Sequence, residues 1–578
     1  MGTARADKKQ RAAAPVSEAT DHSDALSRLF DEVAPLLLPL LPLDARANAT
    51  CVCKAWRAVA AAPTLWAELS FEHCAARVTD AKLAALCARA GPALRTLHLG
   101  TTASRHVTAP GLVAALRDGG CTGVQRISAG WFDASEGEQS FPLTPALVVQ
   151  LSAACPHLVL STFTVACKSF LEAAFAAAAL PGPLTLRIKG DCASDRDEGI
   201  IPMMLRRSVT CLVMRACALS PAEMAALGAA LRMNGTLTDL DLDNNIIASA
   251  DFSALGEALR GNSALRRLDM RDNKIGGRGA ASLGEGLLVN SALESLNLGE
   301  NEIGNDGAVA LGAALRNNRT LTTLSLDGTG IGNDGLVALS EALRTNNMLT
   351  YLDISDNRLD VVGLASLADA LRVSMLTELN LFDSHIKAEG VALLSDALRV
   401  NRTLVTLVLS YNSFDDDGAA ALAQVLRVNS TLTTLNLAHC DIGFAGTSSL
   451  GEALRVNNTL TSLDLSDNAA GAAGAVWIGE ALRASSSALT TLLLEDNGIG
   501  GGGAAALAVA LRVNSTLTRL DISDNSIDDN GAAALAEGLR VNRTLTELYL
   551  TGNDFLIDEW RTTLEEARRL NAKLTISL

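Results

Sequence analysis

From residue 237 onward, the sequence repeats one pattern of apolar and polar positions. Each copy opens with LxxLxL, in which apolar residues two apart predict a short β-strand. It continues with apolar residues three and four apart, as in GAAALAEGLRVN at 531–542, which predicts an amphipathic α-helix. The interval between copies is 28 residues, with 27 before Leu376 and 29 before Leu489, and so regular a period is typical of a solenoid of stacked units. The copies begin at Leu237, Leu265, Leu293, Leu321, Leu349, Leu376, Leu404, Leu432, Leu460, Leu489, Leu517 and Leu545.

Two polar positions of the copy carry structural expectations. The ninth residue, counted from the first leucine, is small and able to form hydrogen bonds in every copy. We therefore expect it to turn inward and bond the buried backbone groups of the bend after the strand. The helix ends at an asparagine such as Asn542, which tolerates the left-handed conformation of a helix C-cap. The ninth residues are Asn245, Asn273, Asn301, Thr329, Asn357, Ser384, Asn412, Cys440, Asn468, Asn497, Asn525 and Asn553.

These copies resemble the leucine-rich-repeat family, whose pattern is LxxLxLxx(N/C)xL, and their length is similar to that of the ribonuclease-inhibitor type. The resemblance covers residues 209–578, because VTCLVMRAC at 209–217 is a weaker copy that precedes Leu237 by one period. It implies an α/β solenoid in the form of a horseshoe, with a parallel sheet on the concave side and helices on the convex side. Residues 72–208 read as leucine-rich repeats of irregular length, with strands expected near 124–127 and 184–188.

The N-terminal residues differ from the repeats. Residues 1–24 are polar and lack periodicity, so we expect a disordered tail. Residues 25–71 are densely apolar and predict a small all-α module, which could simply cover the open end of the solenoid. Their order also resembles an F-box: a leucine-rich segment, then VCKAWR at 52–57, then PTLW at 63–66. Pro35, Pro39 and Pro42 depart from that pattern, because proline interrupts a helix.

The F-box resemblance implies binding to a Skp-type adaptor and, through it, to a cullin-RING ubiquitin ligase. The residues that the resemblance assigns to adaptor binding are Leu29, Phe30, Val33, Val52, Cys53, Trp56, Leu65 and Trp66.

Charge points to the class of partner. The chain carries 48 Lys and Arg against 64 Asp and Glu, a net charge of -16, and the whole excess of acid lies in residues 209–578. Acidic residues recur at the fifth and eighth positions, where stacked strands bring their carboxylates close together on the concave side. This surface predicts a basic protein partner and disfavours nucleic acid, although a merely solubilising surface is the alternative. The residues are Asp241, Asp269, Asp272, Asp353, Asp356, Asp383, Asp464, Asp467, Asp521 and Asp524.

Motifs for catalysis, cofactors and metals are not evident. The seven histidines are dispersed, no GxSxG or Walker-type motif occurs, and Cys51 and Cys53 form CxC rather than CxxC. Arginines recur at the helix ends, where they suit the negative end of the helix dipole. No apolar stretch is long enough to span a bilayer, and the N-terminus lacks a secretory signal. We therefore expect no catalytic residues, no metal, no cofactor, no membrane contact and a cytoplasmic or nuclear location, where sequons such as Asn542-Arg-Thr carry no glycans.

Two functions remain. The first is a substrate-receptor subunit of a Skp-cullin-F-box ubiquitin ligase, in which the horseshoe holds the target and other subunits carry out catalysis. The second is a regulator outside the ligase system, such as one similar to the Ran GTPase-activating proteins, which share repeats of the ribonuclease-inhibitor type. The VCKAWR and PTLW segments favour the first function.

Overall fold

A computed structural model describes residues 68–70, 79–99, 108–122, 124, 126–129, 150, 162–165, 184–188, 209–249, 252–484, 486–555 and 559–578. The chain divides into two compact units, Met1–Arg187 and Ile188–Leu578. Leu29, Phe30, Val33, Val52, Cys53, Trp56, Leu65 and Trp66 lie outside the described residues, as does the tail at 1–24.

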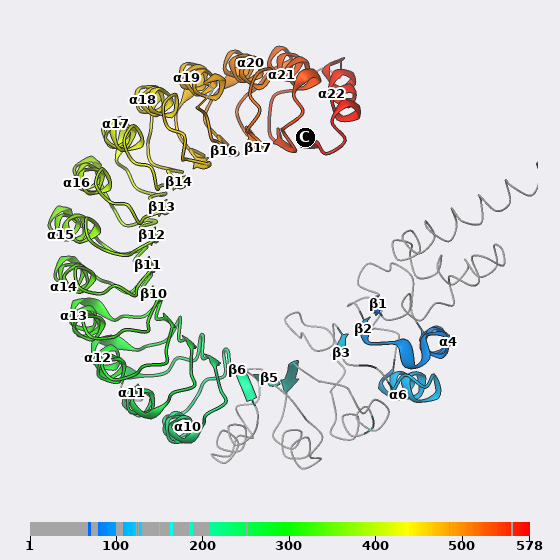
Figure 1. Cartoon of the computed structure of the whole chain (residues 1–578), viewed down its shortest axis with the longest axis vertical. Helices are drawn as coiled ribbons and strands as arrows, with labels where there is room; N and C mark the ends of the chain where they lie inside the picture. The colour runs from blue at the N-terminus through cyan, green and yellow to red at the C-terminus, as the bar shows by residue number, and fades with distance from the viewer. Residues whose placement is uncertain are drawn as a thin grey trace, which may run out of the picture. The chain divides into compact units, whose positions relative to one another are not determined.

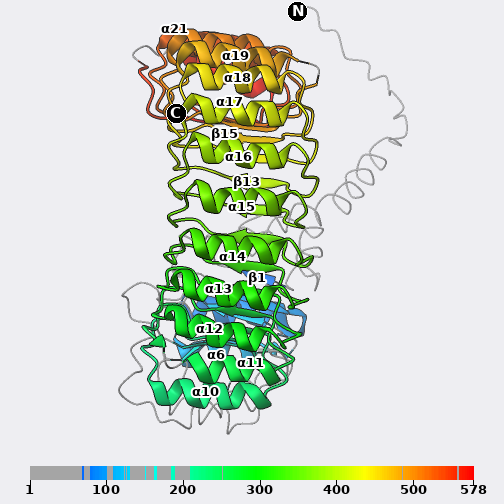
Figure 2. The same ribbon diagram turned by 90° about the vertical axis from the view of Figure 1, so that its left-hand side faces the viewer.

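Strand and helix alternate through the second unit. Its strands curve along the inside of an arc and its helices lie on the outside (Figures 1 and 2), as the 28-residue pattern predicts. The strands are β6 (Val209–Val213), β7 (Asp239–Asp241), β8 (Arg267–Asp269), β9 (Ser295–Asn297), β10 (Thr323–Ser325), β11 (Tyr351–Asp353), β12 (Glu378–Asn380), β13 (Thr406–Val408), β14 (Thr434–Asn436), β15 (Ser462–Asp464), β16 (Thr491–Leu493), β17 (Arg519–Asp521), β18 (Glu547–Tyr549) and β19 (Thr575–Ser577).

Each helix follows its strand and packs against the helix of the next copy. The helices are α10 (Pro221–Met233), α11 (Phe252–Gly261), α12 (Gly276–Leu287), α13 (Gly304–Leu315), α14 (Asn333–Leu343), α15 (Val361–Leu371), α16 (Ala388–Leu398), α17 (Asp415–Leu426), α18 (Phe444–Leu454), α19 (Gly471–Arg483), α20 (Gly500–Leu511), α21 (Asp529–Val541) and α22 (Glu559–Leu570).

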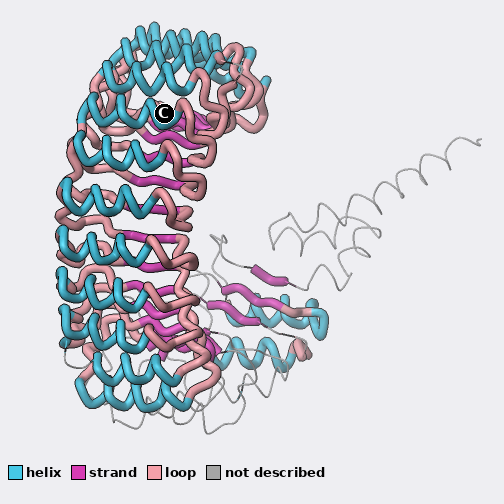
Figure 3. The backbone as a smooth tube through the Cα atoms, turned by 60° about the vertical axis from the view of Figure 1, so that its left-hand side comes forward, coloured by secondary structure: helices cyan, strands magenta, loops and turns pink. Residues whose placement is uncertain are grey.

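The strands from β6 to β19 are parallel and pair in sequence order, so the inner surface is one continuous ladder (Figure 3). Equivalent residues face each other: Leu240 pairs with Leu268, and Leu268 with Leu296. The leucines at position four and the leucine, isoleucine or methionine at position six of each copy are buried between sheet and helices, as are helix residues such as Leu535 and Leu539. The expected strand and helix periods are therefore confirmed.

The ninth-position column bonds the backbone as expected. Asn301 is 2% exposed, and its Nδ2 donates to the carbonyl oxygens of Met270, Leu298 and Gly299 at 3.0, 2.9 and 2.9 Å. Its Oδ1 accepts a hydrogen bond from the Ile275 N–H. Each amide thus joins the bend of its own copy to that of the preceding copy.

The asparagine at the helix end does not form the expected left-handed C-cap. Asn542 is not left-handed, because its φ is -68° and its ψ is 137°. Its buried side chain instead donates to the carbonyl oxygens of Leu511 and Asn514 and accepts from the Leu545 N–H at 2.8 Å. Asn318, Asn401 and Asn429 make equivalent bonds to the preceding helix end. Burial and bonding of these amides fit the expectation that the recurring sequons are part of the repeat rather than glycan acceptors.

Neighbouring helices approach through a column of small residues. A Cβ added at Gly256 on α11 would lie 2.3 Å from the Ser282 carbonyl oxygen on α12. One period apart, Gly312, Ser340 and Ala368 continue the column, and all three are buried. Small side chains at this position therefore let the helices stack closely on the outside of the arc.

The first unit contains shorter strand and helix units. Strands β1 (Glu68–Ser70), β2 (Thr96–Leu99) and β3 (Arg126–Ala129) are parallel, with α4 (Asp80–Ala90), η3 (Gly91–Ala93) and α6 (Ala109–Asp118) between them. Strands β4 (Thr162–Val165) and β5 (Leu184–Ile188) are also described, and β5 matches the strand expected at 184–188.

Strand β1 lies inside the range 25–71 that the sequence predicts to be all-α. Leu69 is fully buried and pairs with Leu97 of β2, so the last residues of that range belong to the strand ladder. None of the helices in the described parts of the chain is long and apolar enough to cross a membrane.

Candidate functional site

The acidic residues at position five close the turn after each strand. Their carboxylate oxygens accept the backbone N–H two residues later: Asp241 from Asp243, Asp464 from Ser466 and Asp521 from Ser523, at 3.0 to 3.1 Å. Asn297 and Asn380 do the same without charge. Turn geometry therefore accounts for an oxygen acceptor at this position, but not for the choice of a charged one.

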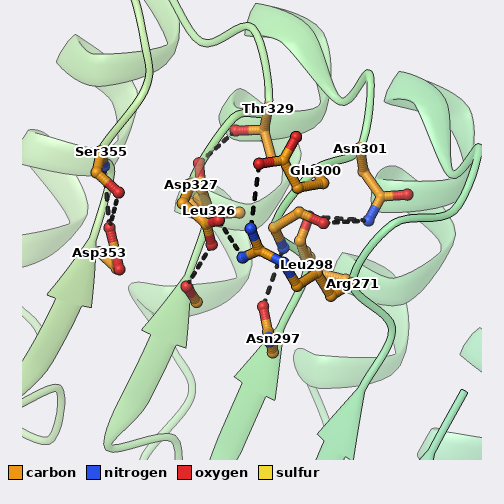
Figure 4. A network of polar contacts seen from close by, with 12 residues as sticks. Arg271, Asn297, Leu298, Glu300, Asn301, Leu326, Asp327, Thr329, Asp353 and Ser355 are labelled. Atoms are coloured by element: carbon orange, nitrogen blue, oxygen red, sulfur yellow. Dashed lines mark hydrogen bonds and ion pairs between the residues drawn. The ribbon is translucent and has the colours of Figure 1, made fainter. Parts of the chain in front are cut away.

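Asp353 is the least accessible residue of the predicted partner surface. It is 8% exposed, and its carboxylate accepts hydrogen bonds from Ser355 N and Ser355 Oγ (Figure 4). It accepts a third bond from Asn380 Nδ2. Its charge also contributes to raising the pKa of Tyr351 to about 12, for which burial is the largest cause. Asp241, Asp269, Asp464 and Asp521 are half-buried.

Position eight carries the accessible carboxylates. Asp272, Asp356, Asp467 and Asp524 are exposed and Asp383 is half-buried. All five residues have a positive φ, between 43° and 53°, a conformation that glycine, asparagine and aspartate adopt most readily. Glycine at Gly328 and Gly552 and asparagine at Asn244 meet the same demand, so the backbone alone does not require the negative charge.

Close spacing of these carboxylates makes the edge of the sheet electronegative. The pKa of Glu495 is raised by burial and then by the charges of Asp521, Asp467, Asp524 and Asp464. The pKa of Glu300 is raised by burial and by Asp327, Asp356 and Asp272, against the opposing effect of Arg271. Burial is the largest cause of both shifts, and the neighbouring carboxylates add to it; these carboxylates should attract basic side chains in the same way.

Arginines neutralise the acid over the first copies of the second unit. Arg271 forms an ion pair with Asp327 and another with Glu300 at 3.1 Å, and Ser325 Oγ donates to Asp327 at 2.8 Å (Figure 4). Gly299 leaves room for this cluster, because a Cβ there would lie 2.1 Å from Asp327 Oδ1. Arg215 pairs in the same way with Asp241 at 2.7 Å.

The acid is not neutralised in the middle of the arc. No ion pair joins Asp356, Asp383, Asp467 or Asp496 to any cation among the described residues. We call these four residues the acidic strip.

An aromatic cluster interrupts the acidic strip, and the sequence reasoning missed it. The Tyr411 ring lies 4.9 Å from the Phe382 ring and 4.5 Å from the His439 ring, with which it is stacked at an interplanar angle of 17°. Phe382 occupies position seven, and Tyr411 and His439 occupy position eight, where other copies carry mainly aspartate, asparagine or glycine. The aromatic residues at position eight were therefore the feature of the sequence that could have predicted this cluster.

Four of the helix-end arginines pair with the next helix: Arg316, Arg344, Arg427 and Arg540. Arg344 meets Asp369 at 3.3 Å, Arg427 meets Glu452 at 2.9 Å, and Arg540 meets Glu566 at 3.2 Å. Since these side chains are about half exposed, each pair contributes roughly 0–1 kcal/mol. The arginine column thus has a structural role on the convex side.

Metal-ligating side chains do not gather in the described parts of the chain. No group of three or more His, Cys, Asp or Glu residues there is placed to hold a metal ion. Cys440 takes the ninth position, with Sγ 3.2 Å from the Leu409 carbonyl oxygen, and burial raises the pKa of its thiol to about 12. A thiol kept protonated in this way is a poor nucleophile.

Comparison with known proteins identifies the repeated unit. A family model described as leucine-rich repeat matches residues 261–284, 289–312, 317–340, 345–368, 374–395, 400–423, 428–451, 456–477, 485–508, 513–536 and 541–559. Residues 261–559 are leucine-rich repeats. The leucine-rich repeats form a solenoid with a parallel sheet inside and helices outside, and they provide a scaffold for protein interaction.

Among solved structures, the chain is similar to an internalin from Listeria monocytogenes str. 4b F2365. The identity is 18%, the TM-score is 0.37, and the match covers 61% of this chain and 82% of that chain. No curated protein matches the sequence.

Proposed function

We propose that this leucine-rich-repeat protein is the substrate-receptor subunit of a Skp-cullin-F-box ubiquitin ligase. Residues 25–71 bind the Skp-type adaptor, the strand-side edge of the repeats binds a basic protein target, and other subunits carry out catalysis. The complex works in the cytoplasm or nucleus. The adaptor half of the proposal is supported by the VCKAWR and PTLW segments.

The acidic strip carries the target half of the proposal. Its carboxylates are accessible at Asp356, Asp467 and Asp496, and they lack ion pairs with the described cations. The pKa of Glu495 beside them is raised by burial and, in second place, by neighbouring acidic charges. A surface of this kind accelerates encounter with a positively charged partner and repels phosphate. A basic protein therefore fits it better than a nucleic acid does.

Adaptor binding is tested with the full chain and a purified Skp-type adaptor. We expect binding by the wild type and its loss in the double variant Leu65→Ala, Trp66→Ala, since apolar anchors of this kind contribute about 2 kcal/mol or more, roughly thirtyfold in affinity. Far-UV circular dichroism should show an intact solenoid in the variant. Absence of adaptor binding by the wild type at micromolar concentrations removes the ligase assignment.

Target binding is tested with a peptide of alternating lysine and glycine as the probe. The triple variant Asp356→Asn, Asp383→Asn, Asp467→Asn should bind it more slowly than the wild type, and its association rate should vary less with ionic strength. Asparagine suits the left-handed backbone at all three positions. Asp353 is left unchanged because its buried carboxylate holds the turn.

A control variant removes the same charge from the convex side. It is the triple variant Glu257→Gln, Glu285→Gln, Glu389→Gln. These glutamates are exposed on helices α11, α12 and α16. Equal slowing by the control and the strip variant indicates only a response to net charge and contradicts a binding surface at the strip.

A further inference from the structure

The neighbouring rings of Phe382, Tyr411 and His439 lie on three consecutive copies, within the acidic strip. Phe382 and Tyr411 are 37% and 45% exposed, and His439 is exposed as well. The chain contains only 3 tyrosines and 12 phenylalanines, and most large apolar side chains of the repeats are buried leucines. An accessible cluster of three rings is therefore outside the repeat pattern.

The backbone makes these residues more unusual. Tyr411 has a φ of 61° and His439 a φ of 54°, both in the left-handed region. Tyrosine fits this region less well than aspartate, asparagine or glycine, which most other copies use at position eight. Ile246 is also at positive φ, so the surrounding structure can hold an unfavourable residue in this conformation.

The turn after strand β13, which leads to Tyr411, lacks the side-chain oxygen that accepts a backbone hydrogen bond in most copies. Position five of the copy that carries Tyr411 is Val408, which has no oxygen to bond the backbone N–H two residues later. Val408 is half-buried, and Val405, which precedes the strand, is 37% exposed. Asp383 follows Phe382 in the same copy, and Asp467 lies one copy after His439, so carboxylates stand at both ends of the cluster.

The same sheet shows which side chain suits a ring beside a carboxylate. The Arg519 guanidinium lies over the Tyr549 ring, 4.8 Å from its centroid, while its Nη1 pairs with Glu547 at 3.1 Å. The arginine satisfies the ring and the carboxylate together. Around Tyr411, rings and carboxylates are present, but none of the described arginines or lysines pairs with Asp383 or Asp467.

We propose that the Phe382–Tyr411–His439 cluster is the anchor of the target surface, and that it binds an arginine side chain of a basic polypeptide segment. The guanidinium stacks on the exposed rings and pairs with Asp383 or Asp467, as Arg519 does with Tyr549 and Glu547. Arginine fits better than lysine because its planar group stacks on rings and pairs with a carboxylate at the same time. The inference rests on the proposed binding of a basic target and adds the residue type that the target presents.

The test compares two peptides of equal length and charge, alternating arginine and glycine or alternating lysine and glycine, with the full-length protein. We expect the arginine peptide to bind about two- to fivefold more tightly, which is the range of an exposed cation–π contact. Tyr411→Asn should abolish this preference and leave the affinity for the lysine peptide nearly unchanged. Asparagine adopts the left-handed conformation more readily than tyrosine does. The melting temperature of the variant should therefore be at least that of the wild type.

A matched control replaces a ring that is already covered. Tyr549→Asn removes the ring beneath Arg519 and should keep the preference for arginine. The anchor is refuted if Tyr411→Asn retains the preference for the arginine peptide. It is also refuted if the wild type binds both peptides equally, although that result is consistent with a basic target. Failure to bind either peptide refutes both the anchor and the basic target, whereas loss of adaptor binding alone affects only the ligase assignment.

Discussion

At the scale of single residues, the fold depends on amides whose hydrogen bonds connect neighbouring copies. Asn357 is 2% exposed, and its Nδ2 donates to the carbonyl oxygens of Leu326, Ile354 and Ser355 while its Oδ1 accepts from the Ile331 N–H at 2.7 Å. Where serine, threonine or cysteine replaces asparagine in this column, fewer bonds form, as for Thr329 with Leu326.

Replacing Asn357 with leucine should therefore destabilise the solenoid. The change leaves several buried backbone groups without partners, at a cost of about 1–3 kcal/mol for such a group. Asn357→Ser should cost less, because Ser384 occupies the same column and still bonds the Phe382 carbonyl oxygen. Chemical denaturation of both variants measures the difference, and equal losses would contradict a hydrogen-bonding role for the column.

At the scale of elements, the outer helices stack because one column on each helix is small. The column contains glycine on α11 and α13, serine on α14 and alanine on α15. Ser340 is fully buried, and its Oγ has no hydrogen-bond partner among the described residues. Size rather than polarity therefore sets the requirement at this position.

Two substitutions separate size from polarity. Gly256→Val forces a side chain against the α12 backbone and should destabilise the protein by about 1–3 kcal/mol, the usual cost of overpacking. Ser340→Ala removes a buried hydroxyl and should be neutral or stabilising. Thermal unfolding of both variants tests this, and a marked loss of stability in Ser340→Ala would show that the hydroxyl matters.

At the scale of the whole molecule, each copy contacts mainly its neighbours, so stability is close to a sum over adjacent pairs. The last helix illustrates this. Trp560 of α22 is 3% exposed, its ring lies 4.6 Å from the Phe555 ring, and its Nε1 donates to Asp529 Oδ1 of α21 at 3.2 Å. The bond to Asp529 joins this copy to the one before it, and the contact with Phe555 lies within the copy.

Trp560→Ala should loosen the last copies without unfolding the middle of the arc. Truncating a buried tryptophan costs about 3–5 kcal/mol, which in a linear array falls on the copies that lose the contact. Hydrogen exchange should therefore lose protection at β17 to β19 and keep it at β9 to β12. Uniform loss along the arc would instead mean that the solenoid unfolds as one cooperative unit.

The sequence by itself determined the repeated strand and helix, the stacking of the copies, and the columns of small polar and of acidic residues. Strand and helix follow from local spacing, because periods of two and of 3.6 residues decide which side chains turn inward. The parallel sheet was expected from the resemblance to leucine-rich repeats. The adaptor-binding residues at 29–66 lie outside the described residues and stay a prediction.

Only the tertiary structure decided which of the acidic residues are accessible and what lies between them. Asp353 and Asp356 are three residues apart and equally charged, yet one is buried in a turn and the other is exposed. Contacts between copies depend on strand register and on the left-handed bend, which local spacing does not encode. The same register brought Phe382, Tyr411 and His439 together, and it gave Asn542 a bond to the preceding helix where the sequence alone suggested a left-handed cap.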